Sequence, residues 1–127
     1  MADQDFNSSV DRFIIEQIDS VPHLEALLLL WNSRPREWTI EEMGGALYVS
    51  AELAEQVLAD LRRRDLIQNA PNPADHYYYE ADPGRDPLLQ KLDRAYRHEL
   101  VRITRLIHSK ASVAVHDFAR AFRFKKD

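Results

Sequence analysis

The chain has no cysteine, which excludes disulfides, thiolate metal sites and cysteine nucleophiles. It has only 3 glycines among 127 residues, a composition that favours helices. Its longest strongly apolar run, residues 26–31, is far too short to span a bilayer. Residues 1–5 are acidic and polar, unlike a signal peptide. We therefore expect one compact, helix-rich protein of the cytoplasm.

Motifs of the common enzyme classes are also missing. The sequence has no GxSxG, no glycine loop that could cradle phosphate and no HExxH. Five histidines are present, but none of them has the spacing of paired metal ligands. The sequence therefore predicts no enzyme, no catalytic residue, no cofactor and no metal site.

Basic residues are scarce in the first two thirds of the chain. Residues 1–82 hold 6 Lys/Arg against 16 Asp/Glu, whereas residues 83–127 hold 11 against 5. This asymmetry suggests that the two halves attract each other or that the basic half meets an anion. The alternative is that both charged faces are simply solvated.

The chain does contain a series of amphipathic segments. Ser9 is expected to cap a first helix that ends near Ile18, after a frayed tail over residues 1–8. Ser20 should cap a second helix that runs to about Ser33 and carries a broad leucine stripe. This second helix is expected to lie at the centre of the core.

Residues 38–81 carry the most informative pattern. Thr39 and Glu42 have the spacing of a capping box, which predicts the start of a short helix. Gly44 and Gly45 lie inside that helix, where each costs about 1 kcal/mol relative to alanine. Close approach of a neighbouring helix would explain them; the alternative is a weak spot.

A second helix should follow, capped by Ser50. Its expected core stripe is Leu53, Val57, Leu58 and Leu61. A strand should then start at Leu66 and Ile67, turn at the proline-rich residues 71–75 and return over residues 76–80. The three tyrosines of the return strand could stack on bases, but a structural role is favoured because tyrosine suits strands. Together these elements predict a two-stranded wing.

A long helix is expected over residues 86–110, with Asp86 as its N-cap and Pro87 as its first residue. An apolar seam recurs along it at nearly heptad spacing and predicts dimerisation; its members are Leu89, Leu92, Tyr96, Leu100, Ile103 and Ile107. The opposite face carries a basic stripe of Lys91, Arg94, His98, Arg102 and Arg105. We expect that stripe to meet protein or solvent, because no aromatic side chains accompany it. Ser112 is expected to cap a last helix.

Residues 39–47, 49–50 and 53–67 resemble the winged-helix transcription regulators, most nearly the MarR-like or PadR-like type. The resemblance implies a mostly α fold with a small two-stranded β-wing, a winged helix-turn-helix followed by a long C-terminal helix. It implies a core with N-terminal helices over residues 1–85 and a helical extension over residues 86–127 for homodimerisation. It also implies that residues 50–64 enter the major groove of duplex DNA. By position, the DNA-binding residues would be Ser50, Ala51, Glu52, Glu55, Gln56, Arg62, Arg63 and Arg64.

The charges of this segment depart from the pattern of the regulators. DNA affinity draws largely on Lys and Arg that neutralise phosphates, yet the first half of the expected reading helix offers Glu52 and Glu55 and no cation. The arginines at its end could contact phosphates or only complement the helix dipole. The sequence therefore leaves two functions open: a DNA-binding transcription regulator, or an interaction module whose acidic face binds a protein partner with a basic surface.

Overall fold

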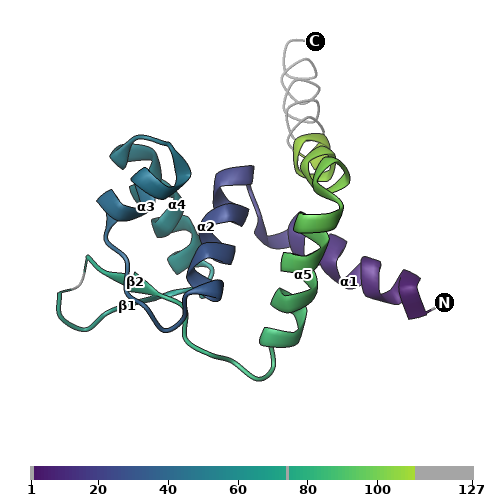
Figure 1. Cartoon of the computed structure of the whole chain (residues 1–127), viewed down its shortest axis with the longest axis horizontal. Helices are drawn as coiled ribbons and strands as arrows, with labels where there is room; N and C mark the ends of the chain where they lie inside the picture. The colour runs from purple at the N-terminus through teal and green to yellow at the C-terminus, as the bar shows by residue number, and fades with distance from the viewer. Residues whose placement is uncertain (1, 74, 111–127) are drawn as a thin grey trace, which may run out of the picture.

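The computed structural model describes residues 2–73 and 75–110. Its elements, in chain order, are α1 (Ala2–Gln17), α2 (Val21–Asn32), α3 (Ile40–Leu47), α4 (Ala51–Arg63), β1 (Gln68–Asn69), β2 (Tyr77–Tyr78) and α5 (Asp86–His98). The backbone is helical again over residues 100–110. In Figure 1, α3, α4 and the strands lie on one side, α1 and α5 on the other, and α2 between them. The predicted winged-helix architecture is confirmed.

Helix α2 forms the centre of the core, as predicted. The Ser20 hydroxyl accepts a hydrogen bond from the His23 amide and so caps its first turn. Most of its side chains are buried, among them Leu24, Leu27 and Leu30. The helix packs against α3, α4 and α5, and it therefore ties the helix-turn-helix to the C-terminal part of the chain.

The packing of α3 against α4 depends on a missing side chain. The predicted capping box is present at Thr39 and Glu42, so the start of α3 is well defined. A Cβ on Gly44 would lie 3.2 Å from the carbonyl oxygen of Val49, in the turn to α4. A Cβ on Gly45 would meet nothing within 4 Å. Each glycine therefore fits one of the two explanations given above. Close approach of the neighbouring backbone explains Gly44, whereas Gly45 is only a weak spot in the helix.

The wing is shorter than the sequence predicted. The antiparallel pairs join Gln68 to Tyr78 and Asn69 to Tyr77. Leu66 and Ile67 precede the strand as buried core residues, so the predicted strand start at Leu66 is wrong. Tyr77 also exchanges two backbone hydrogen bonds with Trp38, of 2.7 and 2.8 Å. This bridge ties the base of the wing to the segment that leads into α3.

The predicted continuous helix over residues 86–110 is interrupted at Glu99, where φ is −130° and ψ is 44°. In the helical segment after the break, Leu100 is 51% exposed and Ile103 is buried. Arg102 of this segment contacts Glu99 at 2.8 Å and Asp11 of α1 at 2.9 Å.

Two other expectations about helix ends are wrong. Ser9 does not cap α1, because the helix already begins at Ala2, within the segment expected to be frayed. Asp86 does not cap α5 either; Arg85 holds the N-cap position without a side-chain hydrogen bond. The Asp86 carboxylate instead accepts hydrogen bonds from the Tyr79 hydroxyl at 2.8 Å, the Asp82 amide at 3.2 Å and the Trp31 indole at 3.3 Å. It therefore connects α2, the wing and α5.

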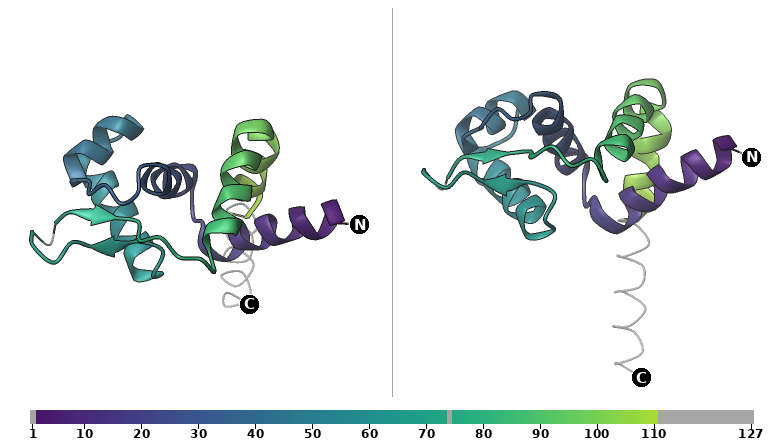
Figure 2. Two further views of the ribbon diagram at one scale, coloured as in Figure 1. Left: turned by 60° about the horizontal axis from the view of Figure 1, so that its bottom comes forward. Right: turned by 90° about the horizontal axis from the view of Figure 1, so that it is seen from below.

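The last predicted helix, from Ser112 onward, lies outside the described residues. Within residues 2–73 and 75–110, no helix combines the length and the apolar character needed to cross a membrane. The rotated views in Figure 2 place the wing and the start of α1 at opposite ends of the molecule.

The glycine pair in α3 yields a matched stability test. Gly45→Ala should raise the free energy of unfolding by about 1 kcal/mol, because alanine favours the helix and meets no neighbour. Gly44→Ala should stabilise less than Gly45→Ala or destabilise, because the Val49 carbonyl oxygen, 3.2 Å from the new Cβ, would have to shift. Urea unfolding of both variants measures the difference. Equal stabilisation by both would contradict the close approach of α3 and α4.

Asp86 yields a pH-dependent prediction. Burial alone would raise the pKa of its carboxyl group, but hydrogen bonds from Tyr79, Asp82 and Trp31 outweigh burial and hold the pKa below its ordinary value. The ionised group therefore stabilises the fold above its ordinary pKa of about 4, and that stability is lost as pH falls through the lower folded value. Asp86→Asn should destabilise the protein by about 1–2 kcal/mol at neutral pH.

Urea unfolding at a series of pH values checks this prediction. The stability difference between the two proteins should narrow as pH falls below about 4. A difference that stays constant from neutral to acid pH would show that the charge of Asp86 does not matter.

Candidate nucleic-acid interface

Helix α4 presents its first two turns to solvent. The Ser50 hydroxyl caps the helix by accepting a hydrogen bond of 3.1 Å from the Leu53 amide. Its buried face consists of Ala54, Val57, Leu58, Asp60 and Leu61. Leu53 was predicted to be buried but is 41% exposed. The helical period explains this correction, since Val57 and Leu58 share a face with Ala54, whereas Leu53 lies at its edge.

Most of the predicted DNA-contacting residues share the exposed face of this helix. Ser50, Ala51, Glu52, Glu55 and Gln56 are all exposed. The two glutamates make this surface acidic. Exposure and spacing thus suit insertion into a groove, whereas the charge does not by itself attract a polyanion.

Tyr48, in the turn between α3 and α4, is a surface residue that sequence reasoning missed. Its backbone is left-handed, with φ 58° and ψ 43°, a conformation that costs a non-glycine residue roughly 1–2 kcal/mol. Its side chain is 94% exposed, beside the start of α4. Because its aromatic ring is held in solvent, Tyr48 is a candidate contact residue. The only feature of the sequence that could have indicated this exposure is its position in the turn.

The three arginines at the end of α4 already have partners within the chain. Arg62 lies 3.5 Å from Asp65, and Arg63 forms a short ion pair with Asp60. Arg64 donates to both carboxylate oxygens of Asp19, at 3.0 and 3.2 Å, and to the Glu16 carbonyl at 2.9 Å. Contact with DNA phosphates would therefore require each arginine to exchange a carboxylate for a phosphate.

A polar cluster lies on the buried side of α4. The Asp60 carboxylate contacts His23 Nε2 at 2.8 Å and accepts from Gln56 Nε2 at 3.0 Å, besides its pairing with Arg63. On the far side of the imidazole ring, Nδ1 lies 2.5 Å from the Ser20 hydroxyl. This cluster joins the start of α2 to α4.

The hydrogen bonds of this cluster keep Asp60 ionised. Burial would raise the pKa of its carboxyl group, but the hydrogen bonds from His23, Arg63 and Gln56 outweigh burial and lower the pKa. Gln56 also bonds this buried carboxylate, so its side-chain amide is already engaged although the residue is exposed.

The wing tip carries no cation among its described residues, which are 71–73 and 75. At its base, His76 Nδ1 lies 3.3 Å from a carboxylate oxygen of Glu37. The wing can therefore approach a duplex by shape but adds little electrostatic attraction.

Most of the predicted dimerisation seam lies inside the chain itself. Leu89, Leu92, Ile103 and Ile107 are buried without any partner chain, and Tyr96 is half-buried with its hydroxyl 3.2 Å from Glu25. Only Leu100 is exposed, next to Val101, which is 62% exposed. The sequence signal for a seam thus arose largely from the core.

The basic stripe is partly neutralised. Arg102 pairs with Asp11 and Glu99, while Arg94, His98 and Arg105 are exposed. Lys110, beyond the stripe, donates to the Ile18 carbonyl at 2.8 Å and so satisfies the C-terminal end of α1. The attraction between the acidic and basic halves inferred from the sequence therefore exists in part within one chain.

Solved structures show the same architecture. A MarR family transcriptional regulator from Streptomyces coelicolor, Sco5413, is 23% identical, with 92% of this chain and 89% of that chain aligned at a TM-score of 0.53. MepR, a transcription regulator of the Staphylococcus aureus multidrug efflux pump MepA, is 14% identical over 97% and 92% of the two chains, with a TM-score of 0.51.

The chain shares the winged-helix fold of these regulators. A further MarR family regulator, SP03579, agrees at 21% identity and a TM-score of 0.50, with 98% of this chain and 83% of that chain aligned. No family model and no curated protein matches the sequence. The fold expected from the MarR-like resemblance is thus confirmed.

Proposed function

We propose that this chain is a transcription regulator that binds duplex DNA in the cytoplasm, with α4 in the major groove and the wing beside it. The observation that supports it best is the presentation of α4: residues 51–56 are all exposed except Ala54. The shared fold with known regulators is consistent with this use.

The acidic face can still read bases. A glutamate carboxylate can accept a hydrogen bond from the amino group of cytosine, so Glu52 and Glu55 would favour cytosine-containing sites. Phosphate contacts would come from Arg62, Arg63 and Arg64 after they leave their carboxylate partners. Each arginine that reaches a phosphate displaces about one condensed counterion from the DNA, so three such contacts should make log K fall with log salt at a slope of about −3.

A charge reversal on the exposed face tests the docking. Glu52→Lys should tighten binding to duplex DNA and steepen the slope of log K against log salt by about 1, because it adds one phosphate contact. Fluorescence anisotropy with a labelled duplex at several salt concentrations measures both quantities.

Gln90→Lys is the matched control, since it also adds one lysine at an exposed position, but on α5, on the other side of the molecule from α4 (Figure 1). It should leave the slope unchanged. Equal effects of the two variants would show that α4 does not face the DNA, and no association at low salt would refute DNA binding itself.

We also infer a homodimer, which would present two copies of α4 to successive turns of the groove. The buried seam residues cannot form its interface, because Leu92→Asp or Ile103→Asp would place a charge in the core and unfold the chain. The exposed pair Leu100 and Val101, at the break after α5, is the apolar surface of this region that a second copy could cover.

The double variant Leu100→Asp with Val101→Asp should shift a dimer to monomer without a loss of fold. Analytical ultracentrifugation measures the mass, and circular dichroism checks the fold. Leu53→Asp, an exposed leucine of α4, is the control and should remain dimeric. A monomeric unmodified chain at micromolar concentration, or dimers that survive the double change, would remove this interface.

A further inference from the structure

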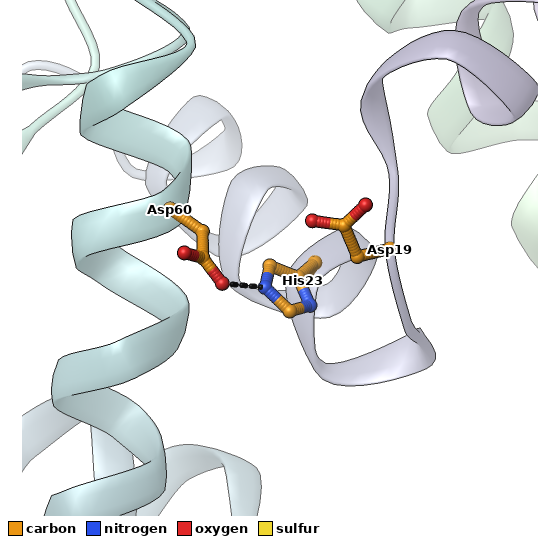
Figure 3. A group of neighbouring side chains, drawn as sticks. All are labelled: Asp19, His23 and Asp60. Carbon is orange, nitrogen blue, oxygen red and sulfur yellow. Dashed lines mark hydrogen bonds and ion pairs between the residues drawn. The ribbon is translucent and has the colours of Figure 1, made fainter.

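The link between α1 and α2 brings a second acidic group, Asp19, to the cluster on the buried side of α4. Asp19, His23 and Asp60 each offer one ligand atom, and these atoms all lie within 4.8 Å of one another. Figure 3 shows that they come from three segments: the link, the start of α2 and the end of α4. His23 and Asp60 are buried, whereas Asp19 lies at the surface. The three potential metal-ligand atoms thus form a compact group that is open to solvent on the side of Asp19.

The donors have the chemistry of a metal site. Two carboxylate oxygens and one imidazole nitrogen form a set that suits zinc, manganese or related divalent ions. Around such an ion, with bonds of about 2.1 Å, ligand atoms lie roughly 3.4 Å apart. The group must therefore contract, and Asp19 can move inward because it lies in a short link rather than within a helix.

The surroundings orient the ligand atoms. A metal-bound histidine normally donates its other ring N–H to a fixed acceptor, and the Ser20 hydroxyl lies 2.5 Å from His23 Nδ1. Gln56 and Arg63 both bind Asp60 Oδ1, which leaves Oδ2 and His23 Nε2 facing each other at 2.8 Å. An ion bound to Nε2 would displace the proton between these two atoms: in the neutral ring the proton moves to Nδ1, which then donates to Ser20, and in the protonated ring it is released to solvent.

We propose that Asp19, His23 and Asp60 bind one divalent transition-metal ion. The ion would lie beside Arg63 and Arg64, which now pair with two of its ligands, Asp60 and Asp19, and beside Lys110, whose ammonium group lies 3.8 Å from Asp19. Its charge weakens both ion pairs by repelling the guanidinium groups. Metal binding therefore frees the two arginines for phosphates; this consequence, unlike the site itself, rests on the proposed function.

Titration of the chelator-treated full chain with Co²⁺ and Zn²⁺ tests the site without DNA. Calorimetry should show one ion per chain, and Co²⁺ should give the visible absorption of a low-coordinate nitrogen and oxygen site. Asp19→Asn should weaken metal binding by about 100-fold or more. Loss of a residue that only supports a ligand already weakens binding by about 10- to 100-fold, and Asp19 is itself a ligand in this proposal. This variant changes a surface residue, so it should stay folded.

His76→Gln is the control, because it removes a histidine at the base of the wing and should leave metal binding intact. His23→Gln, checked for fold by circular dichroism, should abolish binding. Absence of binding by the unmodified chain would overturn the site, as would binding that Asp19→Asn does not weaken.

Anisotropy with duplex DNA, with and without Zn²⁺, then separates the two proposals. Tighter DNA binding with metal in the unmodified chain, but not in Asp19→Asn, supports the coupling. Metal binding without any DNA association would refute the regulator and leave the site standing. DNA association that is indifferent to a bound ion would overturn the coupling alone.

Discussion

The position of α4 depends on a buried carboxylate. Asp60 lies on the core face of α4, among leucines and valine, and an unpaired charge there would be strongly destabilising. His23 from α2, together with Gln56 and Arg63 from α4 itself, supplies its partners. The contact therefore fixes α4 against α2, and it also determines which side chains of α4 remain available at the surface.

That choice of partners explains the unusual charge of the exposed face. The arginines that would ordinarily attract DNA are directed to Asp60, Asp65 and Asp19, while Glu52 and Glu55 face solvent. A winged helix of this kind gains little from long-range attraction, so its binding would rely on shape and base contacts. Under the proposed function, displacement of Asp60 from Arg63 and of Asp19 from Arg64 would make these two arginines available to phosphates.

Local signals in the sequence predicted much of this structure. Thr39, Ser20 and Ser50 identified helix starts because capping needs only neighbours along the chain. The apolar period located α2 and α4. The one error in the buried face of α4 was Leu53, which was chosen because it is a large apolar residue, whereas the buried position belongs to the small residue Ala54. The break at Glu99 was not predictable, because the segment that follows it contacts a different helix: Arg102 pairs with Asp11 of α1.

The polar cluster was equally out of reach of sequence reasoning. His23 and Asp60 are 37 residues apart, and neither belongs to a spacing motif. Likewise, the heptad-like pattern from Leu89 to Ile107 could not reveal whether its partner was a second chain or α1 and α2 of the same one. Periodicity shows which face is apolar, but only the tertiary contacts show what covers it.

Nuclear magnetic resonance of the isotope-labelled chain, titrated with duplex DNA, tests the central claim most directly. If α4 reads the groove, the amide signals of Ser50, Glu52 and Glu55 should shift most, together with the side-chain signals of Arg63 and Arg64. Shifts confined to the basic stripe around Arg94 and Arg105, with α4 unchanged, would contradict the account.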